Sequence, residues 1–174
     1  MKGLTVRTII RIVALGVGFF GIASVGHAEA VNKVFDQWRV NCIETKDNGR
    51  VCALMAGLVN AKKTIVFRWA ISPDKESKTN QITITTLTGV RVSDGISVQF
   101  GQSDPVKVPY RLCMPKFCVA EIPFSDAWLK TLKASKGFTV RIMSANGKEL
   151  KYDLDLNKFS AAYDFYTAEV AKTQ

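Results

Sequence analysis

The stretch that decides the fold is Thr64-Ile65-Val66-Phe67-Arg68-Trp69-Ala70-Ile71. It is dominated by β-branched and aromatic residues, which favour strands because they pack well on a pleated surface. A second stretch, Gln81-Ile82-Thr83-Ile84-Thr85, alternates apolar and polar residues with a period of two. We therefore predict a strand in each place.

The same period continues in both directions from this pair. Gln37 to Cys42 places Trp38, Val40 and Cys42 on one face and polar residues on the other. Further short strands are predicted at Ile96–Phe100, Val106–Val108, Cys118–Ile122, Phe138–Met143 and Leu150–Leu154. Pro109 directly follows one of them and argues that it is an edge strand or a strand end. Short strands separated by Gly, Asn, Asp and Pro clusters predict a mainly β protein, a sandwich or a barrel.

Two stretches break this pattern and predict helices. In the first, about 125–136, Ser125-Asp126 caps the start, Gly137 marks the end, and apolar residues face inward, namely Trp128, Leu129 and Leu132. In the second, about 157–171, a mostly aromatic stripe falls at helical spacing, namely Phe159, Ala162, Tyr163, Tyr166 and Val170. We interpret this stripe as packing against the β domain.

The N-terminus has the pattern of a cleavable secretory signal peptide. Positive charge at Lys2, Arg7 and Arg11 precedes an uncharged apolar run, which is shorter than the about 20 residues that span a bilayer. Small residues then fit signal peptidase, with cleavage expected after Ala28 or Ala30. The predicted organisation is a signal over 1–28 (or 1–30) and one domain over 31–174, with no transmembrane segment after the signal is removed.

The four cysteines of the domain are Cys42, Cys52, Cys113 and Cys118. An even number in an exported chain indicates disulfides, and four cysteines allow three pairings. Locality favours Cys42–Cys52, around the turn signal Asp47-Asn48-Gly49, and Cys113–Cys118, around Pro115. Neither spacing matches a zinc finger or the C-x-x-C of a thioredoxin-like site.

The domain shows no catalytic constellation, metal site or cofactor motif. The single histidine, His27, leaves with the signal, so Ser-His-Asp and Cys-His arrangements are excluded. No phosphate-binding or dinucleotide-binding glycine motif is present. Two acidic doublets, Asp153 with Asp155 and Asp74 with Glu76, are the only candidates for acid–base work, and both lie among lysines. We expect a protein that is not an enzyme, with a carbohydrate-active enzyme using Asp153 and Asp155 as the alternative.

The charge balance is basic. Once the signal is removed after Ala30, 21 basic and 14 acidic residues remain, a net charge of +7. Such a chain is attracted to anionic surfaces, and a candidate anion-binding patch is Lys62, Lys63 and Arg68. A second dense spot is Lys130, Lys133 and Lys136 on the first helix. Aromatic residues are not interleaved with these charges, so nucleic acid is not favoured and anionic polysaccharide is the alternative partner.

Several motifs together resemble the invasion-associated locus B family of exported proteins from Gram-negative α-proteobacteria. They are Trp38-x-Val40-x-Cys42, Val51-Cys52-Ala53, Gly89-Val90, Pro109-Tyr110-Arg111-x-Cys113-x-x-x-x-Cys118-x-Ala120 and Phe159-Ser160-Ala161-Ala162-Tyr163. Phe117 departs from the family, which often has Gly before the second cysteine of the C-x4-C segment. The resemblance implies an immunoglobulin-like β-sandwich in the periplasm, at the outer membrane or secreted. It carries over the cysteines but no catalytic residue or ligand. The resulting hypothesis is a non-enzymatic envelope protein that binds an envelope or host-surface partner and aids host-cell association.

Overall fold

A computed structural model describes residues 30–172 except 46–48, 75–76 and 78. The predicted signal segment 1–28, the turn residues Asp47 and Asn48, and Glu76 lie outside the described residues.

The larger of two antiparallel sheets has seven strands in the order β1-β2-β3-β4-β5-β9-β8. The strands are β1 (Val31–Phe35), β2 (Trp38–Thr45), β3 (Gly49–Val59), β4 (Ile65–Pro73), β5 (Asn80–Leu87), β8 (Tyr110–Cys113) and β9 (Phe117–Pro123). The five strands from β1 to β5 follow one another as a meander, because each is joined to the next by a short connection.

The smaller sheet has four strands in the order β11-β10-β6-β7. They are β6 (Ile96–Phe100), β7 (Val106–Val108), β10 (Gly137–Met143) and β11 (Glu149–Asp155). β7 lies at the edge of this sheet, as Pro109 predicted. The helices are α1 (Asp126–Ala134), α2 (Phe159–Ala171) and one 3-10 turn, η1 (Val92–Asp94).

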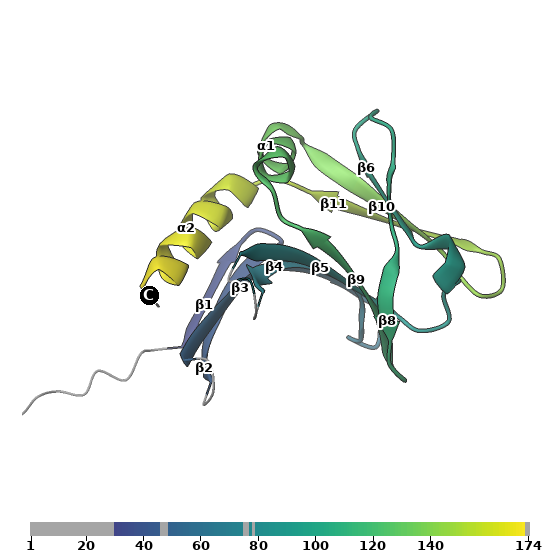
Figure 1. Ribbon diagram of the computed structural model, residues 1–174, viewed down its shortest axis with the longest axis horizontal. Coiled ribbons are helices and arrows are strands. Elements are labelled where there is room, and N and C mark those ends of the chain that lie inside the picture. Colours follow the sequence, from purple (N-terminus) through teal and green to yellow (C-terminus); the bar gives the residue numbers. More distant parts are fainter. Residues whose placement is uncertain (1–29, 46–48, 75–76, 78, 173–174) are drawn as a thin grey trace, which may run out of the picture.

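The core lies between the inner face of the large sheet and a layer made by the small sheet and α2 (Figure 1). Trp69 of β4 meets Phe138 of β10 with ring centroids 4.7 Å apart, which joins the two sheets. Trp38 of β2 meets Phe159 of α2 at 4.9 Å, which places the C-terminal helix over β1 to β3. The prediction of a mainly β protein with two helices is confirmed, and the aromatic stripe does pack inward, with Phe159, Ala162 and Tyr166 buried.

Some boundaries differ from the sequence prediction. β3 is the longest strand and was not predicted, and β1 and β8 were also missed. The first helix begins as predicted, with Ser125 Oγ accepting a hydrogen bond from Trp128 N, but it ends at Ala134. Gly137 does not cap the helix; it begins β10, where a Cβ would lie 2.7 Å from the carbonyl oxygen of Leu154. A glycine at this position therefore lets β10 and β11 approach each other closely.

The immunoglobulin-like arrangement implied by the resemblance is not confirmed. Immunoglobulin domains divide their first strands between two sheets. Here the first five strands all belong to one sheet, and the small sheet is built from later strands. What holds is the coarser description of two antiparallel sheets with two helices.

Candidate binding face

The outer face of the large sheet points away from the small sheet and from α2 (Figure 1). The strand registers align its side chains in two rows across β2, β3, β4, β5 and β9. The rows are Arg39, Met55, Ala70, Thr83 and Glu121, and beside them Gly57, Arg68 and Thr85. We call these eight residues the open face. All are exposed or partly exposed, although they lie on the most extensively paired strands of the sheet.

One end of the open face holds a pocket of about 220 Å³ with two arginines in its wall. Arg39 enters from β2 and Arg68 from β4, while Gly57 of β3 lies between them and contributes no side chain. β3 and β4 approach so closely here that a Cβ at Gly57 would lie 2.9 Å from the carbonyl oxygen of Phe67. The remaining lining residues are Gln37, Met55, Ala56, Val59 and Ile65. Two guanidinium groups above a mostly apolar floor suit a ligand that carries an anionic group.

A second pocket, of about 460 Å³, lies at the diagonally opposite end of the open face. It is lined by Asp74, Ser77, Thr79, Asn80, Gln81, Pro109, Tyr110, Arg111, Glu121 and Pro123. Arg111 and Glu121 form an ion pair on its wall. Asp74 Oδ1 accepts a hydrogen bond from Ser77 N at 2.8 Å, so that carboxylate already has a partner. Burial raises the pKa of the Tyr110 phenol, whose oxygen lies 3.4 Å from Thr86 Oγ1.

The structure divides the predicted patch of Lys62, Lys63 and Arg68. Lys62 and Lys63 lie in the turn between β3 and β4, where Asn60 Oδ1 accepts hydrogen bonds from the amides of Lys62 and Thr64. Arg68 lies three residues into β4, roughly 10 Å along the strand, and lies diagonally from Arg39 across β3, on the wall of the same pocket. Sequence reasoning missed Arg39, because only the register of β2 on β3 brings it near Arg68.

The candidate acid–base pair lies elsewhere. Asp153 and Asp155 are on β11, exposed on the outer face of the small sheet, and line neither pocket. Thr139 Oγ1 donates to Asp153 Oδ1 at 2.6 Å, and this bond, with Lys151 at 3.0 Å, lowers the pKa of Asp153. A general acid requires a raised pKa, so Asp153 has no support in that role, and neither carboxylate lies in a pocket that could hold a substrate.

All four cysteines are in disulfides of the local pairing that the sequence favoured, Cys42–Cys52 and Cys113–Cys118. Each joins directly paired residues of one hairpin, β2–β3 and β8–β9. Cys42 and Cys52 are buried, whereas Cys113 is exposed. Within the described chain, no group of three metal-ligating side chains comes together, and no helix is long and apolar enough to cross a membrane.

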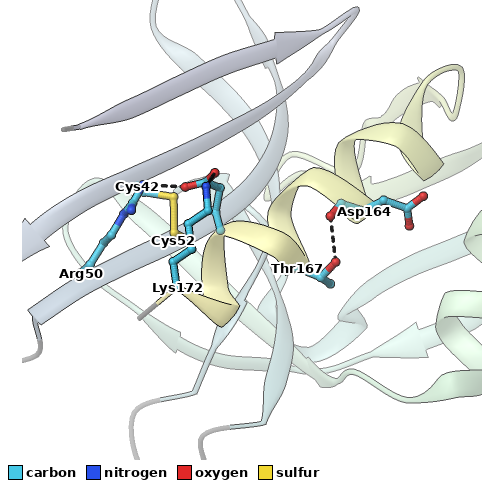
Figure 2. A network of polar contacts seen from close by, with 7 residues as sticks. Cys42, Arg50, Cys52, Asp164, Thr167 and Lys172 are labelled. Carbon is cyan, nitrogen blue, oxygen red and sulfur yellow. Dashed lines mark hydrogen bonds and ion pairs between the residues drawn. A yellow bond between two sulfur atoms is a disulfide. The ribbon is translucent and has the colours of Figure 1, made fainter. Parts of the chain in front are cut away.

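A charge cluster centred on the buried Glu169, absent from the sequence prediction, lies beside Cys42–Cys52 (Figure 2). Glu169 of α2 accepts from Arg50 of β3 and from Lys172, each at 2.6 Å. The Lys172 hydrogen bond, with the charges of Lys172 and Arg50, lowers the pKa of Glu169 against the opposing effect of burial. We call Arg50, Glu169 and Lys172 the Glu169 cluster. It holds the C-terminal helix on the β2–β3 hairpin and is structural.

A family model described as "Invasion associated locus B (IalB) protein" matches residues 38–166. The chain belongs to the invasion associated locus B family. The matched range runs from the first residue of β2 to Tyr166 in α2, and so includes both disulfides and the open face. A search of curated proteins returns no match.

One solved structure with the family's fold is the crystal structure of invasion associated protein B from Bartonella henselae. It has 20% sequence identity to this chain, a TM-score of 0.67, and the match covers 82% of this chain and 98% of that one. At this identity the likeness shows a shared fold and nothing about a shared ligand.

Proposed function

We propose that this member of the invasion associated locus B family is an exported, non-enzymatic envelope protein that binds a partner through the open face. The observation that carries the proposal is the open face itself. A broad sheet surface with a pocket at each end, left uncovered by α2 and the small sheet, is suited to recognition. The secretory pattern at the N-terminus and the two disulfides support a location outside the cytoplasm, in the periplasm or at the outer membrane.

Site-specific photo-crosslinking in the native cells tests this proposal. A photoreactive residue at Met55 or Thr83 of the open face is expected to capture one discrete partner. The matched control is a photoreactive residue at Lys151, which is exposed on the outer face of the small sheet and is expected to capture none. Capture from Lys151 alone, or unprocessed protein found in the cytoplasm on fractionation, would contradict the proposal.

The arginine pocket favours one specific class of partner, an anionic polymer such as an acidic polysaccharide. Removing Arg39 and Arg68 together (R39Q/R68Q) is expected to weaken binding to immobilised heparin by about tenfold at low salt, because two phosphate- or sulfate-binding groups are lost. The same charge change at Lys130 of α1 and Lys136, in the connection between α1 and β10 (K130Q/K136Q), is the control. Equal weakening by both variants would show a non-specific effect of net charge and would reject the pocket.

The proposal also includes a role in host-cell association. It rests on the likeness in fold to the Bartonella henselae protein, whose own name describes it as invasion associated. Deleting the gene and measuring attachment to cultured host cells would test this role separately from the binding face.

A further inference from the structure

Exposed apolar side chains gather at one end of the large sheet. Nine large hydrophobic residues of the described chain are substantially exposed, and five of these lie at this end. They are Val59 (60%), Ile65 (50%), Leu87 (38%), Leu112 (41%) and Met114 (42%). Single exposed apolar residues are ordinary on a protein surface, but a concentration at one place marks an interaction site.

The strand registers place these residues together. Val59 pairs with Ile65 at the β3–β4 turn, and Cys113 pairs with Cys118 at the β8–β9 turn. Leu87, the last residue of β5, pairs with Phe117, and β5 lies between β4 and β9. The two turns are therefore about three strand spacings, or roughly 15 Å, apart. We call the segments Val59–Ile65 and Leu112–Phe117, with Leu87 between them, the hairpin end. Figure 1 shows the β8–β9 hairpin on the side of the molecule away from α2.

The hairpin end is also cationic. Its two segments contain Lys62, Lys63 and Lys116 and no aspartate or glutamate. None of these lysines forms an ion pair with a described residue. On the outer face of the small sheet, by contrast, Lys151 pairs with Asp153 and Arg141 with Glu149. The lysines of the hairpin end are thus available for an external anion.

Both turns are held in a fixed shape. The Asn60 side chain accepts two backbone hydrogen bonds within the β3–β4 turn, and Asn60 N donates to Thr64 O at 3.0 Å. The Cys113–Cys118 bond closes the other turn, and Met114 N donates to Phe117 O at 2.8 Å. Apolar side chains on fixed turns, each beside lysines, match the interface of an anionic bilayer, where the apolar groups enter the headgroup layer and the lysines contact phosphate.

We propose that the hairpin end docks the protein on the surface of an anionic phospholipid bilayer. This docking depends on the proposed export only for the leaflet that the protein meets, because lipid binding itself is a property of the folded chain. The hairpin end is adjacent to the arginine pocket through Val59 and Ile65, so docking would hold the open face close to the membrane.

Co-sedimentation with large unilamellar vesicles tests the docking. Purified protein with both disulfides formed is mixed with vesicles of phosphatidylcholine alone or with vesicles that also contain about 30 mol% phosphatidylglycerol, which gives them a negative surface potential. Binding is expected to be at least about tenfold tighter to the anionic vesicles and to weaken with salt. The double variant K62Q/K63Q is expected to lower the partition coefficient about fivefold for each lysine removed. The variant V59S/I65S, which leaves the charge unchanged, is expected to lower it by about tenfold or more.

K130Q/K136Q is the control, because it removes the same charge from α1 and the connection that follows it. Near-ultraviolet circular dichroism verifies that each variant is folded. Binding that is equal on neutral and anionic vesicles would overturn the proposal. So would absence of binding, or equal loss in K62Q/K63Q and K130Q/K136Q. Each of these results leaves the crosslinking test of the open face unaffected, so the two proposals fail independently.

Discussion

Glu169 shows what one residue contributes to this fold. A glutamate near the end of a helix is normally solvated, yet this side chain is only 5% exposed and lies between Arg50 and Lys172. Arg50 Nε is buried without a hydrogen-bond partner in the described structure. The positive charge of the Arg50 guanidinium is therefore compensated through Glu169. Removing one partner of a buried pair leaves an uncompensated charge, which costs more than the pair contributes.

Glu169→Gln is therefore expected to lower the free energy of unfolding by about 3 kcal/mol, the lower end of the range for a broken buried pair, because Lys172 is largely exposed. Urea denaturation at pH 7 measures the change. The matched control on the same helix is Asp164→Asn, which breaks an exposed ion pair with Lys133 and is expected to cost less than about 1 kcal/mol. Equal costs in the two variants would show that the Glu169 cluster is no more important than a surface ion pair.

The lowered pKa of Glu169 also predicts a pH dependence. The stability from this carboxylate is fully present above its ordinary pKa of 4.5 and is lost as the pH falls through the lower pKa of the folded state. Between pH 5 and pH 2 the wild-type protein is thus expected to lose more stability than Glu169→Gln does. Thermal melts across this range measure the difference, and parallel curves for the two proteins would contradict the assignment.

At the scale of elements, the alternating strands were predictable and β3 was not. Trp38, Val40 and Cys42 alternate cleanly, and all three are buried as predicted. β3 instead carries Ala53, Met55 and Gly57 on its outer side, residues with little strand preference. It is a strand because β2 and β4 pair with it on both sides, which is information that no local pattern contains. The same limit applies to the site, where Arg68 was predicted but its neighbour Arg39 required the register.

The two disulfide-bonded hairpins, β2–β3 and β8–β9, are expected to respond differently to reductant. Cys42 and Cys52 are buried under α2, whereas Cys113 is exposed at the turn of β8 and β9. A thiolate must reach a sulfur atom to exchange, so mild dithiothreitol is expected to reduce Cys113–Cys118 first while Cys42–Cys52 stays oxidised. Alkylation at timed intervals, followed by peptide mass spectrometry, measures the order. Simultaneous reduction of both bonds would mean that opening of the whole domain controls access.

At the scale of the whole molecule, the strands differ in how many paired neighbours hold them. β4 and β5 lie in the middle of the large sheet, each paired with a strand on both sides, and Trp69, Ile71, Ile82 and Ile84 are fully buried in the core. β7 and β8 lie at the free edges of their sheets and have three and four residues. Local stability is expected to be higher in the central strands than in the edge strands. The reason is that a strand opens most readily where few apolar contacts and only one paired neighbour hold it.

Native-state hydrogen exchange is therefore expected to protect the amides of β4 and β5 most, with exchange only through global unfolding. The amides of β7 and β8 are expected to exchange roughly 100-fold faster or more, through local opening. Selective reduction of Cys113–Cys118 provides an internal comparison, since it should accelerate exchange in β8 while leaving β4 and β5 unchanged. The reason is that this bond restrains only the β8–β9 hairpin, whereas β5 is held by β4 and β9 along its whole length. If reduction instead accelerated β4 and β5 by the same factor, the edge hairpin would be part of the global folding unit. The rigid turns of the hairpin end would then depend on the entire sandwich.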